Sequence, residues 1–134
     1  MLTFDDAAAL AAYKDWTATA NTLWTIFSGA AIGFGGAAMK IPPLKEARVL
    51  RLGLGLAWVV FALGNATALY RVQRLVAVIV DGLHARAAQG SNLDPAYRPI
   101  FNAAFYSSPE MVVTFQAVLS IIFLAAILWI PPQK

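Results

Sequence analysis

The sequence predicts an all-α integral membrane protein with three transmembrane helices, the first two of which extend beyond the bilayer on the same side. Three stretches that lack any charged side chain carry this prediction, namely residues 16–39, 52–70 and 111–133. Each supplies the roughly 20 apolar residues that a helix needs to cross a hydrocarbon layer about 30 Å thick. A backbone surrounded by lipid must satisfy its own hydrogen bonds, so such stretches form helices.

The composition supports the same fold class. Hydrophobic residues make up 60% of the 134 residues and charged residues only 13%, against about 25% charged residues in soluble proteins. This length has room for three spans and one modest extramembrane element, so we expect a single helical membrane domain over residues 1–134. The net charge of +3 comes without a long basic run, which indicates anchoring beside the membrane and no nucleic-acid partner.

The first helix is expected to run from about Phe4 to Met39 and to span the membrane over residues 17–39. Thr3 and Asp6 have the spacing of a capping box, and the alanines that follow favour a helix. Pro42 and Pro43 end it. Such a helix is about 54 Å long at about 1.5 Å per residue, so its first turns must lie outside the hydrocarbon.

The second helix is expected to start at residues 44–48, to span residues 50–70 and to continue to about Gln89. Its continuation carries an apolar stripe at helical spacing. We expect the stripe to pack against the start of the first helix in an antiparallel pair; a helix that lies flat among the lipid headgroups is the alternative. The stripe comprises Val72, Val76, Ile79, Val80, Leu83 and Ala87, and the expected contacts on the first helix are Phe4, Ala8, Ala11 and Ala12.

The remaining extramembrane region, within residues 71–109, contains the loop signals. Gly90, Pro95 and Pro99 favour a loop, and a short helical turn is expected from Asp94. The third helix then starts with Ser108 as its cap, Pro109 at its first position and Glu110 in its first turn. Its span covers residues 110–130, and Pro131 ends it.

Lysine and arginine divide evenly between the two faces of this topology. Four of them, Lys40, Lys45, Arg48 and Arg51, gather in the short loop after the first span. Because short loops weigh most in the positive-inside rule, we expect this loop and the C-terminus to be cytoplasmic and the N-terminus to lie outside. The predicted location is the cytoplasmic (inner) membrane.

The chain offers few groups for catalysis or cofactor binding. It has no cysteine and one histidine, His84, with Asp81 one helical turn earlier. A solvated neighbour pair explains these two residues; the alternatives are a pH-sensitive contact or one metal ligand completed by other subunits. The spans lack the buried ionisable residues of proton or ion relays. We therefore expect no enzyme activity, no cofactor and no metal site.

Small residues define the predicted helix-packing interface. Gly29 and Gly33 form a GxxxG motif that Gly36 extends. Gly53 and Gly55, with Gly64 further along, offer a second surface on the next helix. Such ridges let another helix approach closely, where packing drives association. Either another helix of this chain or a neighbouring subunit can fill them.

Polar residues within the spans have two interpretations. They form hydrogen bonds between packed helices, or they line a pore or a substrate path in an oligomer. The candidate lining residues are Thr22, Thr25, Ser28, Asn65 and Gln116.

These features favour a non-catalytic helical subunit of a larger membrane protein complex, which docks through helix packing. The alternative is a self-assembling oligomeric pore, channel or membrane-disrupting effector. The expected partners are membrane lipids together with other membrane subunits or copies of the same chain.

Overall fold

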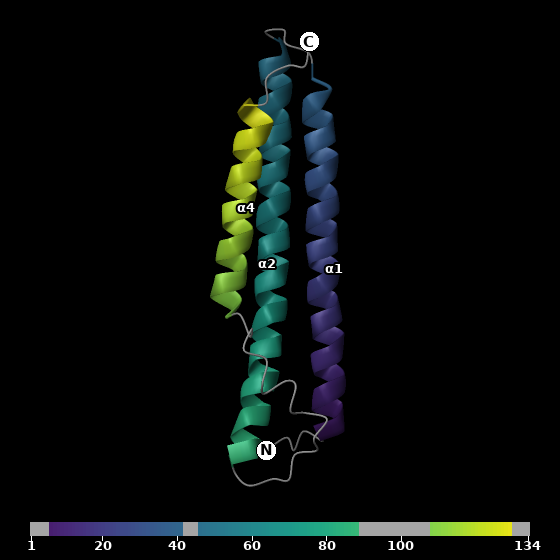
Figure 1. The fold of residues 1–134 in the computed structure, drawn as a ribbon, viewed down its shortest axis with the longest axis vertical. Coiled ribbons are helices and arrows are strands. Elements are labelled where there is room, and N and C mark those ends of the chain that lie inside the picture. Colours follow the sequence, from purple (N-terminus) through teal and green to yellow (C-terminus); the bar gives the residue numbers. More distant parts are fainter. Residues whose placement is uncertain (1–5, 42–45, 89–107, 130–134) are drawn as a thin grey trace.

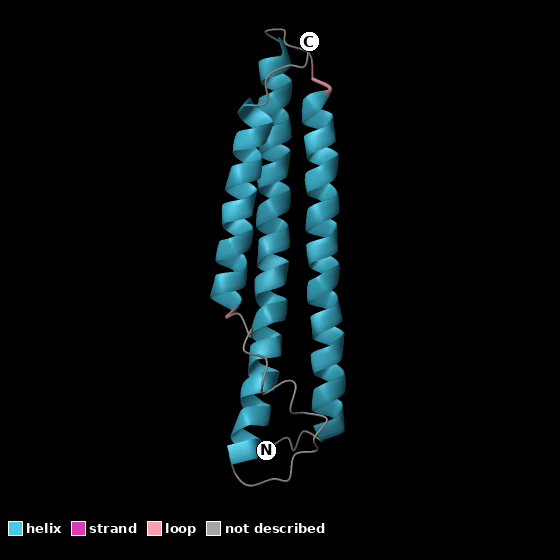
Figure 2. Cartoon of the chain, viewed as in Figure 1, coloured by secondary structure: helices cyan, strands magenta, loops and turns pink. Residues whose placement is uncertain are grey.

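The computed structural model describes residues 6–41, 46–88 and 108–129. Within these ranges the chain forms three helices and no strand: α1 (Asp6–Met39), α2 (Glu46–Ala88) and α4 (Pro109–Trp129). All three are long and apolar enough to cross a membrane. The predicted fold class is confirmed, and the helical arrangement is visible in Figure 2.

The first two helices are longer than a bilayer requires. α1 has 34 residues, α2 has 43 and α4 has 21, which corresponds to about 51, 65 and 32 Å at about 1.5 Å per residue. Figure 1 shows α1 and α2 running past the start of α4 at the same end of the bundle. The predicted extension of both helices to one side is therefore confirmed.

The charge-free segments of the three helices end at a common level there. Ala20 of α1, Leu69 and Val72 of α2 and Val112 of α4 pack in one cluster. The charged residues that end the charge-free segments at this cluster are Asp15 of α1, Arg71 of α2 and Glu110 of α4. Since each helix presents its first charge close to the same cluster, the bundle has one boundary at which a hydrocarbon layer can end.

The helix ends follow the predicted capping signals. At the end of α1, the amides of Lys40 and Ile41 donate to carbonyls three residues earlier, at N–O distances of 3.1 and 3.4 Å, so the last turn tightens before Pro42. At the start of α4, the amide of Met111 donates to Ser108 Oγ at 3.2 Å. Ser108 is thus the cap that the sequence predicts.

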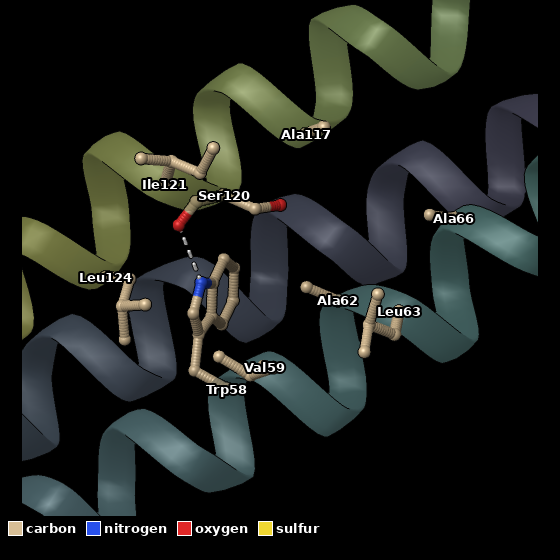
Figure 3. A pocket seen from close by; sticks show the side chains of 9 residues that line it. All are labelled: Trp58, Val59, Ala62, Leu63, Ala66, Ala117, Ser120, Ile121 and Leu124. Atoms are coloured by element: carbon tan, nitrogen blue, oxygen red, sulfur yellow. Dashed lines mark hydrogen bonds between the residues drawn. The ribbon is translucent and has the colours of Figure 1, made fainter. Parts of the chain in front are cut away.

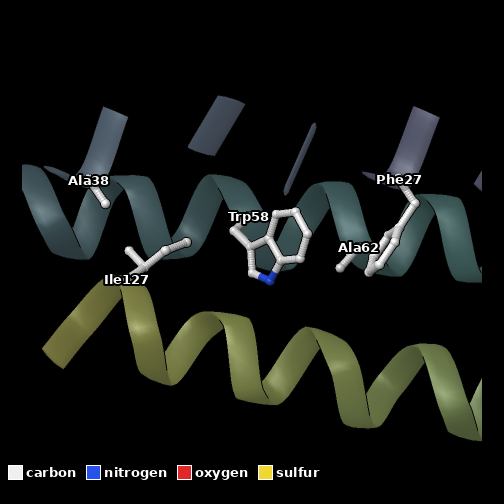
Figure 4. Close-up of a cluster of buried hydrophobic side chains, with 5 residues drawn as sticks. All are labelled: Phe27, Ala38, Trp58, Ala62 and Ile127. Carbon is white, nitrogen blue, oxygen red and sulfur yellow. The ribbon is translucent and has the colours of Figure 1, made fainter. Parts of the chain in front are cut away.

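α2 is the central helix, and an aromatic cluster holds it between α1 and α4. Trp58 is fully buried and lies with its ring centroid 5.4 Å from that of Phe27, 5.5 Å from that of Phe34 and 4.7 Å from that of Phe123. Offset and edge contacts of this kind stabilise a pair beyond the area that it buries. Figure 4 shows the buried residues of this cluster, which are Phe27, Ala38, Trp58, Ala62 and Ile127.

The extension of α2 buries most of its predicted stripe. Val72, Val76, Val80 and Leu83 are buried, and Ile79 is half-buried. α2 continues as one helix past Val72, which packs with Ala20 of α1 (Figure 1). The start of the extension therefore forms the expected antiparallel pair, and packing against α1 nearer its end stays a prediction.

The prediction of which α1 residues face this stripe was partly wrong. Ala9 is buried and Ala12 half-buried, whereas Ala8 and Ala11 are exposed. A run of consecutive alanines has no apolar period, so it cannot reveal which of its members face the neighbouring helix. Several other expectations fall on residues or side chains outside the described ones: the contact of Phe4, the Thr3 cap, the side chain of Ala87, the loop with its turn at Asp94, and the stop at Pro131.

Candidate functional site

The outer face of α1 carries a ridge of small residues, which we call the α1 ridge. Gly29, Gly33 and Gly36 are exposed, and exposed Thr22 and Thr25 continue the same helical face. A Cβ atom added at any of the three glycines would have no described atom within 4 Å. Within the described residues, therefore, no other helix of this chain packs on the GxxxG motif.

The threonines of the α1 ridge satisfy their own hydroxyl groups. Thr22 Oγ1 donates to the carbonyl of Ala18 and Thr25 Oγ1 to that of Asn21, both at 3.0 Å. A hydroxyl that donates to a carbonyl in the preceding turn of its own helix needs no other acceptor, even when it faces lipid. Both side chains can thus face either lipid or a neighbouring helix without further partners.

The glycines of α2 divide between an open face and a contact with α4. Gly53 and Gly64 are exposed and have no described atom within 4 Å of a built Cβ. At Gly55 that Cβ would lie 3.2 Å from Leu124 Cδ1 and 3.5 Å from Leu128 Cδ2. Gly55 is therefore a close-approach point within the bundle.

α1 has one such point as well. A Cβ at Gly35 would lie 3.2 Å from Phe123 Cζ. Gly55 belongs to the predicted second close-approach surface, and its contact with α4 confirms that prediction; Gly35 was not predicted. The GxxxG spacing selects Gly29 and Gly33, and Gly35 lies on another face of α1, so motif spacing could not have found it.

The predicted polar lining does not form one surface. Thr22, Thr25 and Ser28 are exposed on α1, whereas Asn65 and Gln116 lie inside the bundle at 7% and 0% exposure. Asn65 Nδ2 and both polar atoms of the Gln116 side chain are buried without a hydrogen-bond partner. Burial of amide groups in this state costs about 1–3 kcal/mol each.

α2 and α4 also form an apolar groove of about 250 Å³. The indole of Trp58 lies at its floor and donates to the carbonyl of Ser120 at 3.0 Å (Figure 3). Because this bond uses the indole N–H, the groove offers alkyl and ring surface with little polar character. Its other lining residues are Val59, Ala62, Leu63, Ala66, Ala117, Ile121 and Leu124.

The described residues bring no reactive groups together. Among them, no group of three or more His, Asp or Glu side chains is placed to hold a metal ion. Asp81 and His84 are both exposed on the extension of α2. What the geometry supplies is a set of packing surfaces: the α1 ridge, the open face of α2 and the groove.

No protein-family model, no curated protein and no solved structure matches this chain.

Proposed function

We propose that the protein is a non-catalytic helical subunit of a larger membrane assembly and that the α1 ridge is the surface on which a helix of another subunit docks. The single observation that supports this proposal is the open space above Gly29, Gly33 and Gly36. A neighbouring helix can approach the backbone closely at such positions, and close packing drives helix association in lipid.

The energetic cost of these glycines strengthens the argument. A glycine within a helix is less favourable than alanine by about 0.8–1.0 kcal/mol in helix propensity. At Gly35 and Gly55 the close contact with α4 explains why the residue is glycine, because a side chain there would press against α4. At Gly29, Gly33 and Gly36 no contact among the described residues does so, and a helix outside this chain supplies the compensating packing.

A self-assembled pore is the second candidate. Thr22, Thr25 and Ser28 would face its lumen, since all three are exposed on α1. The geometry favours this candidate less, because Thr22 and Thr25 already bond to their own helix and need no water-filled path. Asn65 and Gln116, buried inside the bundle, could not line a pore built on α1.

The test is native mass spectrometry of the protein after gentle solubilisation from its source membrane. We expect a complex that contains other polypeptides, and we expect Gly29→Leu together with Gly33→Leu to release this chain from it. The matched control is Ala125→Leu with Ala126→Leu, which enlarges two exposed residues of α4 and should leave the complex intact.

Two outcomes contradict the proposal. A mass equal to several copies of this chain alone favours the pore, and conductance measurements on Thr25→Val in planar bilayers would follow. A mass equal to one copy shows that no subunit docks on the α1 ridge.

A further inference from the structure

The end of the charge-free segment of α2 presents two arginines beside an aromatic ring. Tyr70, Arg71 and Arg74 line a cavity of about 450 Å³ together with Leu75 and Val78. The guanidinium carbon of Arg74 lies 6.0 Å from the centre of the Tyr70 ring. A cation over an aromatic face is held there by the ring quadrupole, so one side of this guanidinium is fixed and its other N–H groups remain for a ligand.

Neither arginine is neutralised by a carboxylate of the described residues. Arg71 and Arg74 are both exposed, and Arg74 lies over the Tyr70 ring. Two guanidinium groups at i, i+3 lie on neighbouring positions of one helical face. Planar guanidinium groups match the oxygens of a phosphate in a bidentate manner, and the pair therefore forms an anion site.

In a bilayer whose hydrocarbon layer ends at the common boundary of the three helices, the site would lie at the level of the phospholipid phosphates. Arg71 is the first charged residue after the span of α2, and it adjoins the cluster of Leu69 and Val72 that marks the common boundary of the three helices. Tyrosine is enriched at this depth of a membrane, which is where Tyr70 lies.

Three exposed apolar residues lie on α2 about two to four turns before the arginines, toward the middle of the charge-free segment. Leu63, Val60 and Leu56 are 64%, 64% and 66% exposed. Leu63 precedes Arg74, and Val60 precedes Arg71, by 11 residues, about three full turns, so both lie on the face of α2 that carries the arginines. Leu56 lies about one turn beyond Val60. A molecule with a phosphate at one end and an alkyl chain at the other can bind both parts of this surface.

We propose that Arg71 and Arg74 bind the phosphate of an anionic phospholipid, whose acyl chain lies along Leu63, Val60 and Leu56. An anionic headgroup fits better than a zwitterionic one, because choline or ethanolamine would place a third cation beside the two arginines. Basic pockets at helix ends recognise anionic lipids in this way. The site is separate from the α1 ridge and depends only on insertion of the helices into a membrane.

The experiment measures lipid binding to the full-length protein in detergent by native mass spectrometry. Phosphatidylglycerol and phosphatidylcholine with identical acyl chains are titrated separately. We expect the protein to retain phosphatidylglycerol preferentially. Arg71→Gln with Arg74→Gln should lower the affinity for phosphatidylglycerol about 30-fold, the factor that two basic side chains supply at a charged membrane surface, and leave phosphatidylcholine binding unchanged.

The matched control removes two positive charges at the opposite end of the bundle. Lys40→Gln with Arg48→Gln changes the net charge equally at two exposed residues and should preserve the preference. Two results would contradict the proposed site: an equal loss of affinity for phosphatidylglycerol in both double variants, or equal retention of the two lipids by the unaltered protein. Helical content measured by circular dichroism should be the same in all variants.

Two further arms identify the ligand. The deacylated headgroup, glycerophosphoglycerol, should displace the lipid only at a large excess. If it competes as strongly as the intact lipid, the site binds free phosphate esters, and the proposal of a phospholipid site is wrong. Arg71→Lys with Arg74→Lys keeps the charge but loses the planar fork, so its affinity should lie between those of the unaltered protein and the glutamine variant. Gly29→Leu with Gly33→Leu should bind the lipid normally, so failure of either proposal is seen separately.

Discussion

Trp58 of α2 donates its indole N–H to the backbone carbonyl of Ser120 on α4, with 3.0 Å between Nε1 and the oxygen. The same indole contacts rings from α1, α2 and α4. A fully buried side chain with one polar atom thus joins all three helices at one level, and the hydrogen bond fixes the rotation of α4 about its axis relative to α2.

Trp58→Phe should destabilise the bundle by about 1–2 kcal/mol, because it removes the hydrogen bond and leaves space where the larger ring lay. The measurement is reversible unfolding in mixed micelles with increasing sodium dodecyl sulfate, followed by far-ultraviolet circular dichroism. Trp129→Phe is the matched control, since Trp129 is 85% exposed and should change the unfolding free energy by less than about 0.5 kcal/mol. Equal effects of both substitutions would show that the contacts of the Trp58 indole do not stabilise the bundle.

Gln116→Leu should stabilise the isolated protein by about 1 kcal/mol. The Gln116 side chain is fully buried and its amide has no partner, whereas the unfolded state in detergent lets the amide reach water. Replacement by an apolar side chain of similar volume removes this desolvation cost. The same unfolding assay measures the change, with Thr114→Val on the exposed face of α4 as control. A loss of stability would show that the amide of Gln116 has a partner in solution.

The helix ends and the membrane spans could be predicted from the sequence because their signals are local. Ser108 and Pro109 mark the start of α4, and Pro42 follows the tightened last turn of α1. Charge-free runs need no partner helix to be recognised, since lipid itself is the solvent that selects them. These parts of the prediction agree with the structure.

The faces of the spans could not be predicted. A helix in lipid is apolar on all sides, so Leu56 at 66% exposure and Trp58 at 0% look alike in sequence. The hydrophobic period that separates buried from exposed positions in a soluble helix is absent there. It returns in the extension of α2, where Val76 and Val80 are buried as expected. For the same reason the sequence does not distinguish the buried amides of Asn65 and Gln116 from the exposed threonines of α1.

Gly55→Leu should destabilise the bundle by about 1–3 kcal/mol, the usual cost of a larger side chain in a packed interface. Its Cβ alone would lie 3.2 Å from Leu124 Cδ1, so the rest of the side chain must push α2 and α4 apart. Gly53→Leu, two residues earlier on the open face, should be neutral or slightly stabilising, because leucine favours a helix more than glycine does. Unfolding in mixed micelles compares the two. The same cost at both positions would contradict the assigned rotation of α2.

Disulfide trapping should detect the packing of the α1 and α2 extensions. The chain has no cysteine, so a pair introduced as Ala9→Cys and Val80→Cys reports only on itself. Both residues are buried, at 5% and 3% exposure, on the parts of the two helices that run past the start of α4 (Figure 1). A disulfide needs Cα atoms within about 7 Å, which the facing sides of packed helices can supply.

The control pair is Ala11→Cys with Val78→Cys, at exposed positions of the same two segments. After mild oxidation of the protein in liposomes, electrophoresis without reductant should show the internally cross-linked form for the buried pair much earlier than for the exposed pair. If the extension of α2 left α1 and lay on the membrane surface, the buried pair would have no advantage. Faster cross-linking of the buried pair therefore establishes that the antiparallel pair continues beyond the membrane, where the apolar stripe of α2 would otherwise face water.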